Sequence, residues 1–339
     1  MRDDMILCQQ KVAEVLAQVN QIVIGKEECV RKVMAAILAG GHILLEDIPG
    51  VGKTTLAMAF SETMALQNNR LQFTPDVMPS DLLGFSMYQK QTGTFEYQTG
   101  AVMCNLFLGD EINRTSPKTQ SALLEVMEEG NVTVDGVTRK VPEPFVVSDQ
   151  LSHLNDLLWI QAEPFVVIAT ENPAGSVGTQ LLPESQLDRF MICTSLGYPS
   201  LENEIAIVKG RQIQDDKAVL QPVINAEQLL YCKKLVEQIY MADDIYRYLC
   251  ELCQTTRTNP LIELGVSPRG SVALMRISKA IAFLHGRDYV IPGDIDEIFL
   301  DVAAHRLVRS AKAKAAKRSA ESILIEVMQN VKKPTAARR

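Results

Sequence analysis

The sequence predicts an α/β protein in which a parallel sheet with helices on both faces is followed by an all-helical domain. From residue 42 to about residue 198, apolar runs of strand length alternate with helical segments, which is the pattern of βαβ units. Two stretches with hairpin chemistry, 85–99 and 131–141, interrupt that alternation as insertions. After Tyr198 and Pro199 the pattern is helical throughout.

These patterns divide the chain near residue 200. We expect residues 1–200 to form the α/β core, which begins with an amphipathic helix over residues 4–22. We expect residues 201–310 to form the helical domain and residues 311–339 a basic helix and tail. Because that last segment is rich in Lys, Arg and Ala, a solvated helix with a frayed end is favoured over a docking arm for an acidic partner.

The composition indicates a globular protein. The 339 residues are 47% hydrophobic and 22% charged, with a formal net charge of −7, which argues against a general binder of nucleic-acid backbones. No apolar run approaches the roughly 18 residues that a membrane-spanning helix needs. The first residues also lack the basic and apolar pattern of a secretory signal. We therefore expect a cytoplasmic protein, and the seven scattered cysteines favour reduced thiols over a disulfide framework.

The first strand of the core leads into a glycine-rich loop that is typical of phosphate binding. The apolar run at 42–45 precedes the letters PGVGKTT, and a helix follows. Gly50 and Gly52 allow successive backbone amides to face an anion at the helix N-terminus. Lys53 can reach the β- and γ-phosphates, and Thr54 can bind Mg²⁺. The sequence therefore predicts binding of ATP or GTP by Pro49, Gly50, Val51, Gly52, Lys53, Thr54 and Thr55.

One position departs from the general pattern of this loop. The first glycine of G-x-x-x-x-G-K-[ST] is Asp47 in this chain. We expect this change to affect only the first turn of the loop, because the two glycines that form the phosphate cradle are present.

Polar side chains end two further strands of the predicted sheet. The run NLFLGDE ends in Asp110 and Glu111 at the carboxyl edge, where parallel sheets place their ligands. Asp110 would hold Mg²⁺, and Glu111 would orient and polarise the water that attacks the γ-phosphate. The run FVVIAT ends close to Asn172, whose amide could bond the same water or could belong to an ordinary turn before Pro173. These strand ends predict hydrolysis rather than binding alone.

A series of segments, in their order, resembles the MoxR family of AAA+ ATPases. They read LLEDIPGVGKTTLA, LQFTPDVMPSDLLG, GDEINRTSPKTQSALLEVMEEGNVTVDG, ATENP, LPESQLDRF and ELGVSPRGSVALMRISKAIAFLHGRDYVIPGDI, so the resemblance covers roughly residues 20–310. It implies an AAA+ P-loop core, with the two hairpins as insertions, and a helical lid domain. It also implies ATP and Mg²⁺ as cofactors, and a homo-oligomer in the form of a hexameric ring.

The resemblance implies roles for individual residues as well. Arg189, in LDRF, corresponds to the arginine finger that is offered to the γ-phosphate of a neighbouring subunit, and Arg269, in SPRG, corresponds to sensor 2. Either arginine could instead form an ordinary surface ion pair. The other implied roles are Walker A for Lys53 and Thr54, Walker B for Asp110 and Glu111, and sensor 1 for Asn172.

One short segment occurs twice. The letters EPFVV stand at 143–147 and again at 163–167, which indicates a local duplication. Because the second copy runs directly into Ile-Ala-Thr, we expect it to be the core strand and the segment near 148–167 to be an insertion. A surface excursion is favoured for the insertion over a new partner site.

We therefore interpret the chain as a mechanical ATPase that couples hydrolysis to the remodelling or maturation of protein complexes. The resemblance suggests proteins with von Willebrand A domains as partners. The alternative is a nucleic-acid-associated AAA+ motor, which the negative net charge and the lack of an attached DNA-binding motif disfavour. A GTPase switch is also disfavoured, because the chain contains no Asn-Lys-x-Asp motif that would read guanine.

Overall fold

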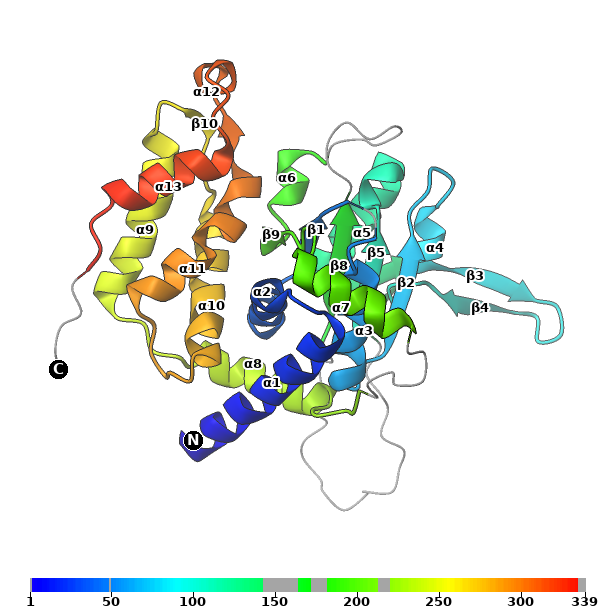
Figure 1. Cartoon of the computed structure of the whole chain (residues 1–339). Coiled ribbons are helices and arrows are strands. Elements are labelled where there is room, and N and C mark those ends of the chain that lie inside the picture. Colours follow the sequence, from blue (N-terminus) through cyan, green and yellow to red (C-terminus); the bar gives the residue numbers. More distant parts are fainter. Residues whose placement is uncertain (1, 49, 143–163, 172–181, 213–219, 335–339) are drawn as a thin grey trace.

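A sheet of five parallel strands, in the order β2-β5-β8-β1-β9, lies at the centre of the α/β core (Figure 1). The computed structural model describes residues 2–48, 50–142, 164–171, 182–212 and 220–334. The predicted fold class, a parallel sheet followed by a helical lid, is confirmed. The strands of the sheet are β1 (Ile43–Glu46), β2 (Asn68–Gln72), β5 (Leu106–Asp110), β8 (Val166–Glu171) and β9 (Ile192–Thr194).

Helices cover both faces of this sheet. Successive side chains of a strand point to opposite faces, and Ile43 and Leu45 join one hydrophobic cluster while Leu44 joins another. The strands β1, β5 and β8 are therefore buried on both sides, which explains why they read as continuous apolar runs in the sequence. The first cluster includes residues of α1 (Arg2–Ile22), α2 (Glu27–Leu38) and α3 (Lys53–Thr63), and the second includes residues of α4 (Pro79–Leu83) and α5 (Pro117–Glu129).

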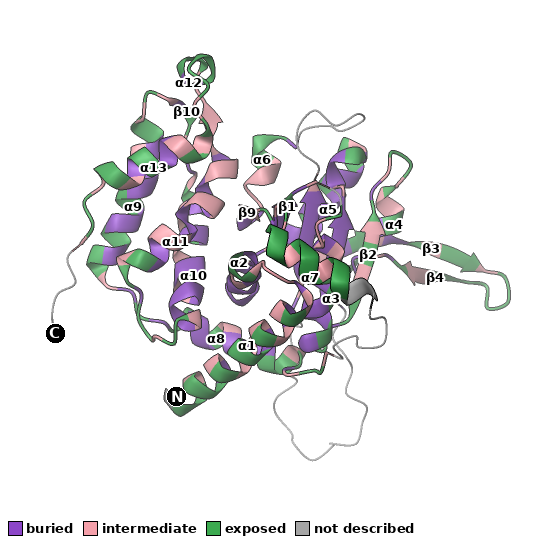
Figure 2. Cartoon of the chain, viewed as in Figure 1, coloured by how far each residue is buried: buried purple, intermediate pink, exposed green. Residues whose placement is uncertain are grey.

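Both predicted hairpins are present as antiparallel pairs. The first consists of β3 (Gly84–Gln89) and β4 (Thr94–Thr99), and it projects away from the core with a largely exposed surface (Figures 1 and 2). The second consists of β6 (Asn131–Val134) and β7 (Val137–Lys140). Between these two strands Asp135 has a φ of 50° and Gly136 a φ of 77°, the positive values that the predicted type I′ turn requires.

The duplicated segment contributes one of the central strands. Val166 and Val167, from the second copy of EPFVV, begin β8, which pairs with β5 on one side and with β1 on the other. The prediction that the second copy is the core strand is therefore confirmed. Of the predicted insertion near 148–167, residues 148–163 lie outside the described residues.

The lid follows α7 (Leu201–Gln212) and is mainly helical. It contains α8 (Ala226–Glu237), α9 (Asp243–Thr258), α10 (Pro268–Leu284), α11 (Pro292–Ala303), the 3-10 helix η2 (Ala304–Arg306), α12 (Ala311–Ala315) and α13 (Ala320–Asn330). It also contains a two-stranded ribbon of β10 (Ile262–Leu264) and β11 (Val308–Arg309), which strands this short do not reveal in a sequence. Within the described ranges, no helix combines the length and apolar character needed to cross a membrane.

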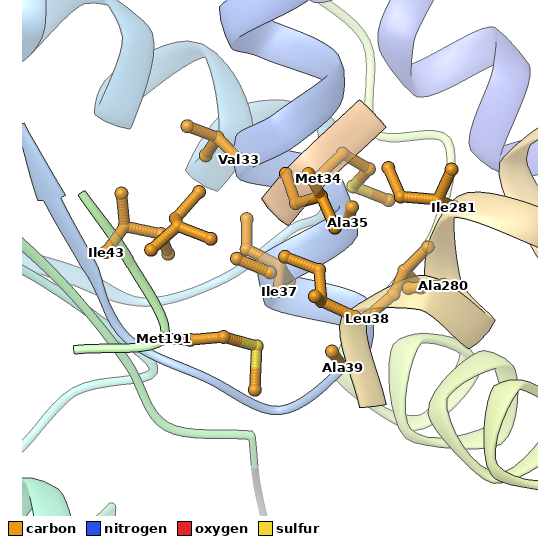
Figure 3. Packing of buried hydrophobic residues seen from close by; sticks show 14 of the residues in the cluster. Val33, Met34, Ala35, Ile37, Leu38, Ala39, Ile43, Met191, Ala280 and Ile281 are labelled. Atoms are coloured by element: carbon orange, nitrogen blue, oxygen red, sulfur yellow. The ribbon is translucent and has the colours of Figure 1, made fainter. Parts of the chain in front are cut away.

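Helix α2 joins the core to the lid. Figure 3 shows its apolar side chains between Ile43 of β1 and Met191 on one side and Ala280 and Ile281 of α10 on the other. One face of the sheet, α2 and several lid helices thus share a single hydrophobic cluster. Burial of this apolar surface stabilises the orientation of the lid on the core.

The prediction of a solvated helix near the C-terminus is wrong for α13. Ile323, Leu324 and Val327 of this helix are buried, and the helix packs against α9 and α11. The basic residues concentrate ahead of it, between residues 306 and 318. The Lys and Arg content of the whole segment therefore concealed an apolar stripe with helical spacing.

Candidate active site

The glycine-rich loop connects β1 to α3 and forms one wall of a polar cavity. Gly52 precedes α3 with a φ of 103°, Gly50 has a φ of 89°, and a Cβ at either position would meet no atom within 4 Å. The left-handed backbone, rather than crowding, is therefore what requires glycine here. The cavity has a volume of about 350 Å³, and its lining residues are Gly50, Gly52, Lys53, Thr54, Thr55, Arg70, Gln72, Asp110, Glu111 and Thr170.

The structure brings most of the predicted loop residues to this cavity. Val51 instead packs against the hydrophobic cluster that α2 and α3 share. Pro49 lies outside the described residues. The N-terminus of α3, an 11-residue helix that begins at Lys53, lies at the cavity and supplies free backbone amides and a positive dipole end to an anion.

Lys53 is held in place by the start of its own loop. Its side chain is only 8% exposed, and its ammonium group donates a hydrogen bond to the backbone carbonyl of Asp47 at 2.7 Å. Burial lowers the pKa of Lys53, and the negative charges of Asp47, Asp110, Glu111 and Glu171 oppose that shift. The lysine is therefore a desolvated cation near several carboxylates. Phosphate oxygens could replace the carbonyl of Asp47 as its hydrogen-bond acceptor.

Asp47, the residue that replaces the usual first glycine, anchors the loop to the end of the sheet. Its carboxylate accepts hydrogen bonds from Ser195 Oγ at 2.7 Å, from the Leu196 amide at 2.6 Å and from the Gly197 amide at 2.9 Å. These donors follow β9, and Ser195 and Leu196 also line a second polar cavity of about 350 Å³ beside the start of α2. The prediction that only the first turn is affected did not anticipate this connection, because it depends on residues about 150 positions apart.

Asp110 and Glu111 lie where the buried strand β5 ends. Glu111 adopts a left-handed backbone conformation with a φ of 59° and a ψ of 49°, so the chain turns sharply directly after Asp110. The Glu111 amide donates to Thr170 Oγ1 at 2.9 Å, and that hydroxyl donates to Asp110 Oδ1 at 3.4 Å. A strained non-glycine residue that the neighbouring strand holds in place is a feature of functional sites.

Three polar side chains that the sequence analysis did not single out orient the two carboxylates. Arg70 Nε donates to Asp110 Oδ2 at 2.7 Å. Glu111 Oε2 accepts from Gln72 Nε2 at 3.2 Å and from Arg114 at 2.8 Å. Arg70 and Gln72 belong to the edge strand β2, whose register sets Gln72 opposite Asp110. No local pattern marks them, because their role depends on which strand pairs with β5.

Glu171 ends β8 next to Glu46, which ends β1 in the paired register. Burial raises the pKa of Glu171 to about 7, the nearby charge of Glu46 raises it further, and Lys53 opposes both effects. Burial likewise raises the pKa of Glu46. The sheet edge beside the lysine therefore carries a carboxyl group that titrates near neutral pH. Asn172, the predicted sensor 1, follows Glu171 and lies outside the described residues.

Arg189 and Arg269 meet each other away from this cavity. Arg189 Nε lies 3.0 Å from Glu128 Oε2, and an Arg269 guanidinium nitrogen lies 3.2 Å from Glu128 Oε1. Of the described residues, neither arginine is among those that line the polar cavity beside Lys53, which we call the phosphate cavity. The structure thus brings Lys53 to the same cavity as Asp110 and Glu111, and it places the two arginines together at a different point of the same chain.

The residues at the cavity fit a divalent cation beside a nucleotide. The hydroxyl of Thr54 and the carboxylate of Asp110 line the same cavity, and both are oxygen ligands of the kind that Mg²⁺ prefers. Since Mg²⁺ is usually bound by one or two protein groups together with substrate phosphates, this donor set is sufficient.

This strand order, with a glycine loop after one strand and adjacent carboxylates after its second neighbour, defines a P-loop ATPase of the AAA+ class. Known families agree: the family described as "ATPase family associated with various cellular activities (AAA)" matches residues 42–157 and 150–192, and the AAA lid domain matches residues 254–327. More narrowly, the chain belongs to the MoxR family of AAA+ ATPases. It is 33% identical to the chaperone MoxR1 of Mycobacterium tuberculosis, over 94% of this chain and 81% of that protein.

Two further proteins are similar over nearly the whole chain. The uncharacterised protein YeaC of Bacillus subtilis is 43% identical over 95% of each chain. A crystal structure from Cytophaga hutchinsonii, described as a candidate ATPase, is 32% identical with a TM-score of 0.86 over 98% of each chain. The resemblance to the MoxR family and the predicted ATPase activity are therefore confirmed.

Proposed function

We propose that this AAA+ ATPase hydrolyses ATP with Mg²⁺ at the interface between neighbouring copies of the chain, in a homohexameric ring. Hydrolysis would drive the remodelling or maturation of protein complexes, with von Willebrand A-domain proteins as partners. The relative named chaperone MoxR1 supports a role that acts on other proteins. The seven cysteines are free thiols, which supports the cytoplasm as the place of action.

The separation of the arginines from the phosphate cavity carries this proposal. Lys53, Asp110 and Glu111 surround one space, whereas Arg189 and Arg269 share the carboxylate of Glu128. Charge that develops on the γ-phosphate needs cationic stabilisation beyond Lys53, and Arg70, the other described cation that lines the cavity, is bound to the Asp110 carboxylate at 2.7 Å. If the two arginines act on a nucleotide, a neighbouring chain is the partner whose cavity they can reach without rearrangement of their own chain.

Each residue at the cavity then has a defined task. The amides of the loop and Lys53 bind the β- and γ-phosphates, and Glu111, held by Gln72 and Arg114, orients the attacking water. Thr54 and Asp110 would hold Mg²⁺, which neutralises developing charge on the phosphates when it is bound. Asn172 would bond the attacking water or the γ-phosphate.

The arginine is tested by removing it and by mixing assemblies. Arg189→Ala should bind ATP with unchanged affinity and should hydrolyse it about 10³-fold more slowly, because an arginine finger supplied in trans contributes roughly 10³–10⁵ in turnover. Glu111→Gln should bind ATP and stall. A mixture of the two variants should regain part of the activity that both lack, since some interfaces combine an intact Glu111 with an intact Arg189.

Three measurements decide the matter: ATP turnover, ATP affinity, and sedimentation in ATP to establish that the two variants assemble together. Wild-type turnover by Arg189→Ala alone would remove this arginine from the mechanism. Confirmed co-assembly with no recovery of activity would show that the site is not shared between subunits.

A further inference from the structure

A single carboxylate of the core holds two separate elements of the lid. Asp188 directly precedes Arg189, and its Oδ1 lies 2.7 Å from Arg306 Nε at the end of η2. Ser267 Oγ lies 3.2 Å from Oδ1 and 3.0 Å from Oδ2 of the same carboxylate. Because Ser267 precedes α10 and Arg306 follows α11, Asp188 joins two ends of the lid to the segment that carries Arg189.

Arg306 is a buried cation that binds backbone carbonyls on both sides of Arg189. Its side chain is only 2% exposed. Beyond Asp188 Oδ1, its guanidinium donates to the backbone carbonyls of Asp188 at 3.1 Å, Phe190 at 2.6 Å and Met191 at 3.2 Å, and also to that of Val302. The carbonyls on both sides of Arg189 are therefore held by one planar group, which leaves the backbone at Arg189 little freedom.

Ser267 carries the same constraint to Arg269. Its hydroxyl oxygen accepts a hydrogen bond from the Gly270 amide at 3.1 Å and so caps the first turn of α10, in which Arg269 is the second residue. Gly270 lets this turn approach the Arg306 side chain closely, because a Cβ there would lie 2.6 Å from Val266 Cγ1 and 2.9 Å from Arg306 Cδ. The start of α10 thus packs against the Asp188–Arg306 pair.

Arg189 and Arg269, which lie close to Asp188 and Ser267 in the chain, both bind the carboxylate of Glu128. Arg189 and Arg269 bind the two oxygens of Glu128, at 3.0 and 3.2 Å. Two cations that share one carboxylate are spaced to share one phosphate group as well, since both anions present oxygens a short distance apart.

We propose that Asp188 and Arg306 are positioning residues for ATP hydrolysis. They hold Arg189 and Arg269 at the separation at which both arginines address one phosphate of the neighbouring subunit's nucleotide. The proposal rests on the shared active site proposed above. Asp188 and Arg306 would position the arginines that each subunit presents to its neighbour. They would have no role in binding the subunit's own ATP.

Asp188→Asn is the sharpest variant. It keeps the size of the side chain and an acceptor for Ser267, and it removes the charge that faces Arg306. We expect ATP affinity to stay within about 3-fold of wild type and kcat to fall about 10- to 100-fold, the loss that a misplacement of about 1 Å produces. Arg306→Lys, which keeps the charge and loses the fork of donors, should lower kcat in the same way.

Mixing experiments distinguish this role from general damage to the fold. Asp188→Asn mixed with Glu111→Gln should regain activity. The first variant is impaired only in the arginines that it presents to its neighbour, and the second only in its own ATP site. Asp188→Asn mixed with Arg189→Ala should show no more than the residual activity of the Asp188→Asn protein, because both variants are impaired in the same half of the interface. Sedimentation in ATP establishes co-assembly in each mixture.

A second buried ion pair of the lid supplies the matched control. Asp294 is 2% exposed and pairs with Arg287 at 2.7 Å, and it contacts neither Arg189 nor Arg269 in the described structure. Asp294→Asn should lower the unfolding temperature and leave kcat unchanged. If Asp188→Asn fails to fold, Arg306→Lys takes its place in every mixture.

The failures of the two proposals differ. If Arg189→Ala and Glu111→Gln assemble together without recovery, the shared site is wrong, and the positioning role is overturned with it. If that mixture recovers while Asp188→Asn with Glu111→Gln does not, only the positioning role is overturned. A wild-type kcat for Asp188→Asn and Arg306→Lys would overturn it as well.

Discussion

The phosphate cavity and the arginine pair differ most in how they are buried. Lys53 is 8% exposed and Asp110 is 7% exposed, and both have hydrogen-bond partners within the chain. The side chains of Arg269 and Glu128 are 43% and 44% exposed, and that of Arg189 is 29% exposed. The polar groups of the cavity are therefore buried and hydrogen-bonded within the chain, whereas the contact of the two arginines with Glu128 is open to solvent.

This difference has energetic consequences. A buried polar group without a partner costs about 1–3 kcal/mol, so the chain must satisfy the groups around the cavity before any ligand arrives. An exposed ion pair contributes about 0–1 kcal/mol, so the bonds to Glu128 can be exchanged for bonds to another anion at little cost. The cavity is suited to bind, and the arginine pair is suited to change partners.

The largest expected effect separates binding from chemistry inside the cavity. Lys53→Ala removes the buried cation and should weaken ATP binding by about 100-fold, since charge-assisted hydrogen bonds contribute about 1.5–3 kcal/mol each. Glu111→Gln should leave ATP affinity unchanged and abolish turnover, because its carboxylate acts on water. Equilibrium binding of ATP and a steady-state ATPase assay measure the two effects. Normal hydrolysis by Glu111→Gln would exclude Glu111 from its role.

A second effect concerns pH and is confined to the sheet edge. The pKa of Glu171 is about 7 in the folded chain, against an ordinary value of 4.5, so the folded state binds the proton more tightly than the unfolded state. The free energy of unfolding should therefore fall as pH rises from about 4.5 through about 7, by up to about 3 kcal/mol.

Glu171→Gln should remove this slope and leave the protein more stable than wild type at pH 8 in the absence of nucleotide. Denaturant unfolding at several pH values measures it. His42 is a background that both proteins share: burial lowers its pKa to about 4, so its contribution to stability is lost as pH falls from 6.5 toward 4. Equal slopes for the variant and the wild type would show that Glu171 does not carry the effect.

The smallest expected effect lies at the arginine pair. Glu128→Gln breaks two half-exposed ion pairs, so the free energy of unfolding should change by less than about 1 kcal/mol. Release of Arg189 and Arg269 should make assembly in ATP about 2- to 5-fold more favourable, which corresponds to the same energy. Thermal unfolding and sedimentation measure the two changes. Weaker assembly would mean that Glu128 itself belongs to the interface.

The sequence was most informative where a function depends on neighbouring residues. The phosphate loop, the paired carboxylates after β5 and the Asp-Gly turn of the second hairpin were all predicted, because each is a short stretch whose backbone geometry restricts the residue types allowed. The resemblance to the MoxR family identified the two arginines in the same way, from the short motifs LDRF and SPRG.

Residues that act through distant partners escaped prediction. Arg70 and Gln72 matter only because β2 lies beside β5, and Asp47 matters only because the chain returns 150 positions later. The apolar stripe of α13 escaped for a related reason, since Ile323, Leu324 and Val327 are diluted in a segment whose overall composition is basic.

The sequence by itself determined the fold class, the glycine-rich loop and the adjacent carboxylates after β5, because backbone geometry and hydrophobic periodicity act over a few residues. Only the tertiary structure decided that Asp47 ties the loop to the end of β9 and that Glu128 receives both arginines. The tertiary structure alone decided that Asp188 binds both Ser267 and Arg306 of the lid. These contacts join residues 60 to 150 positions apart, and packing of the sheet, α2 and the lid brings them together.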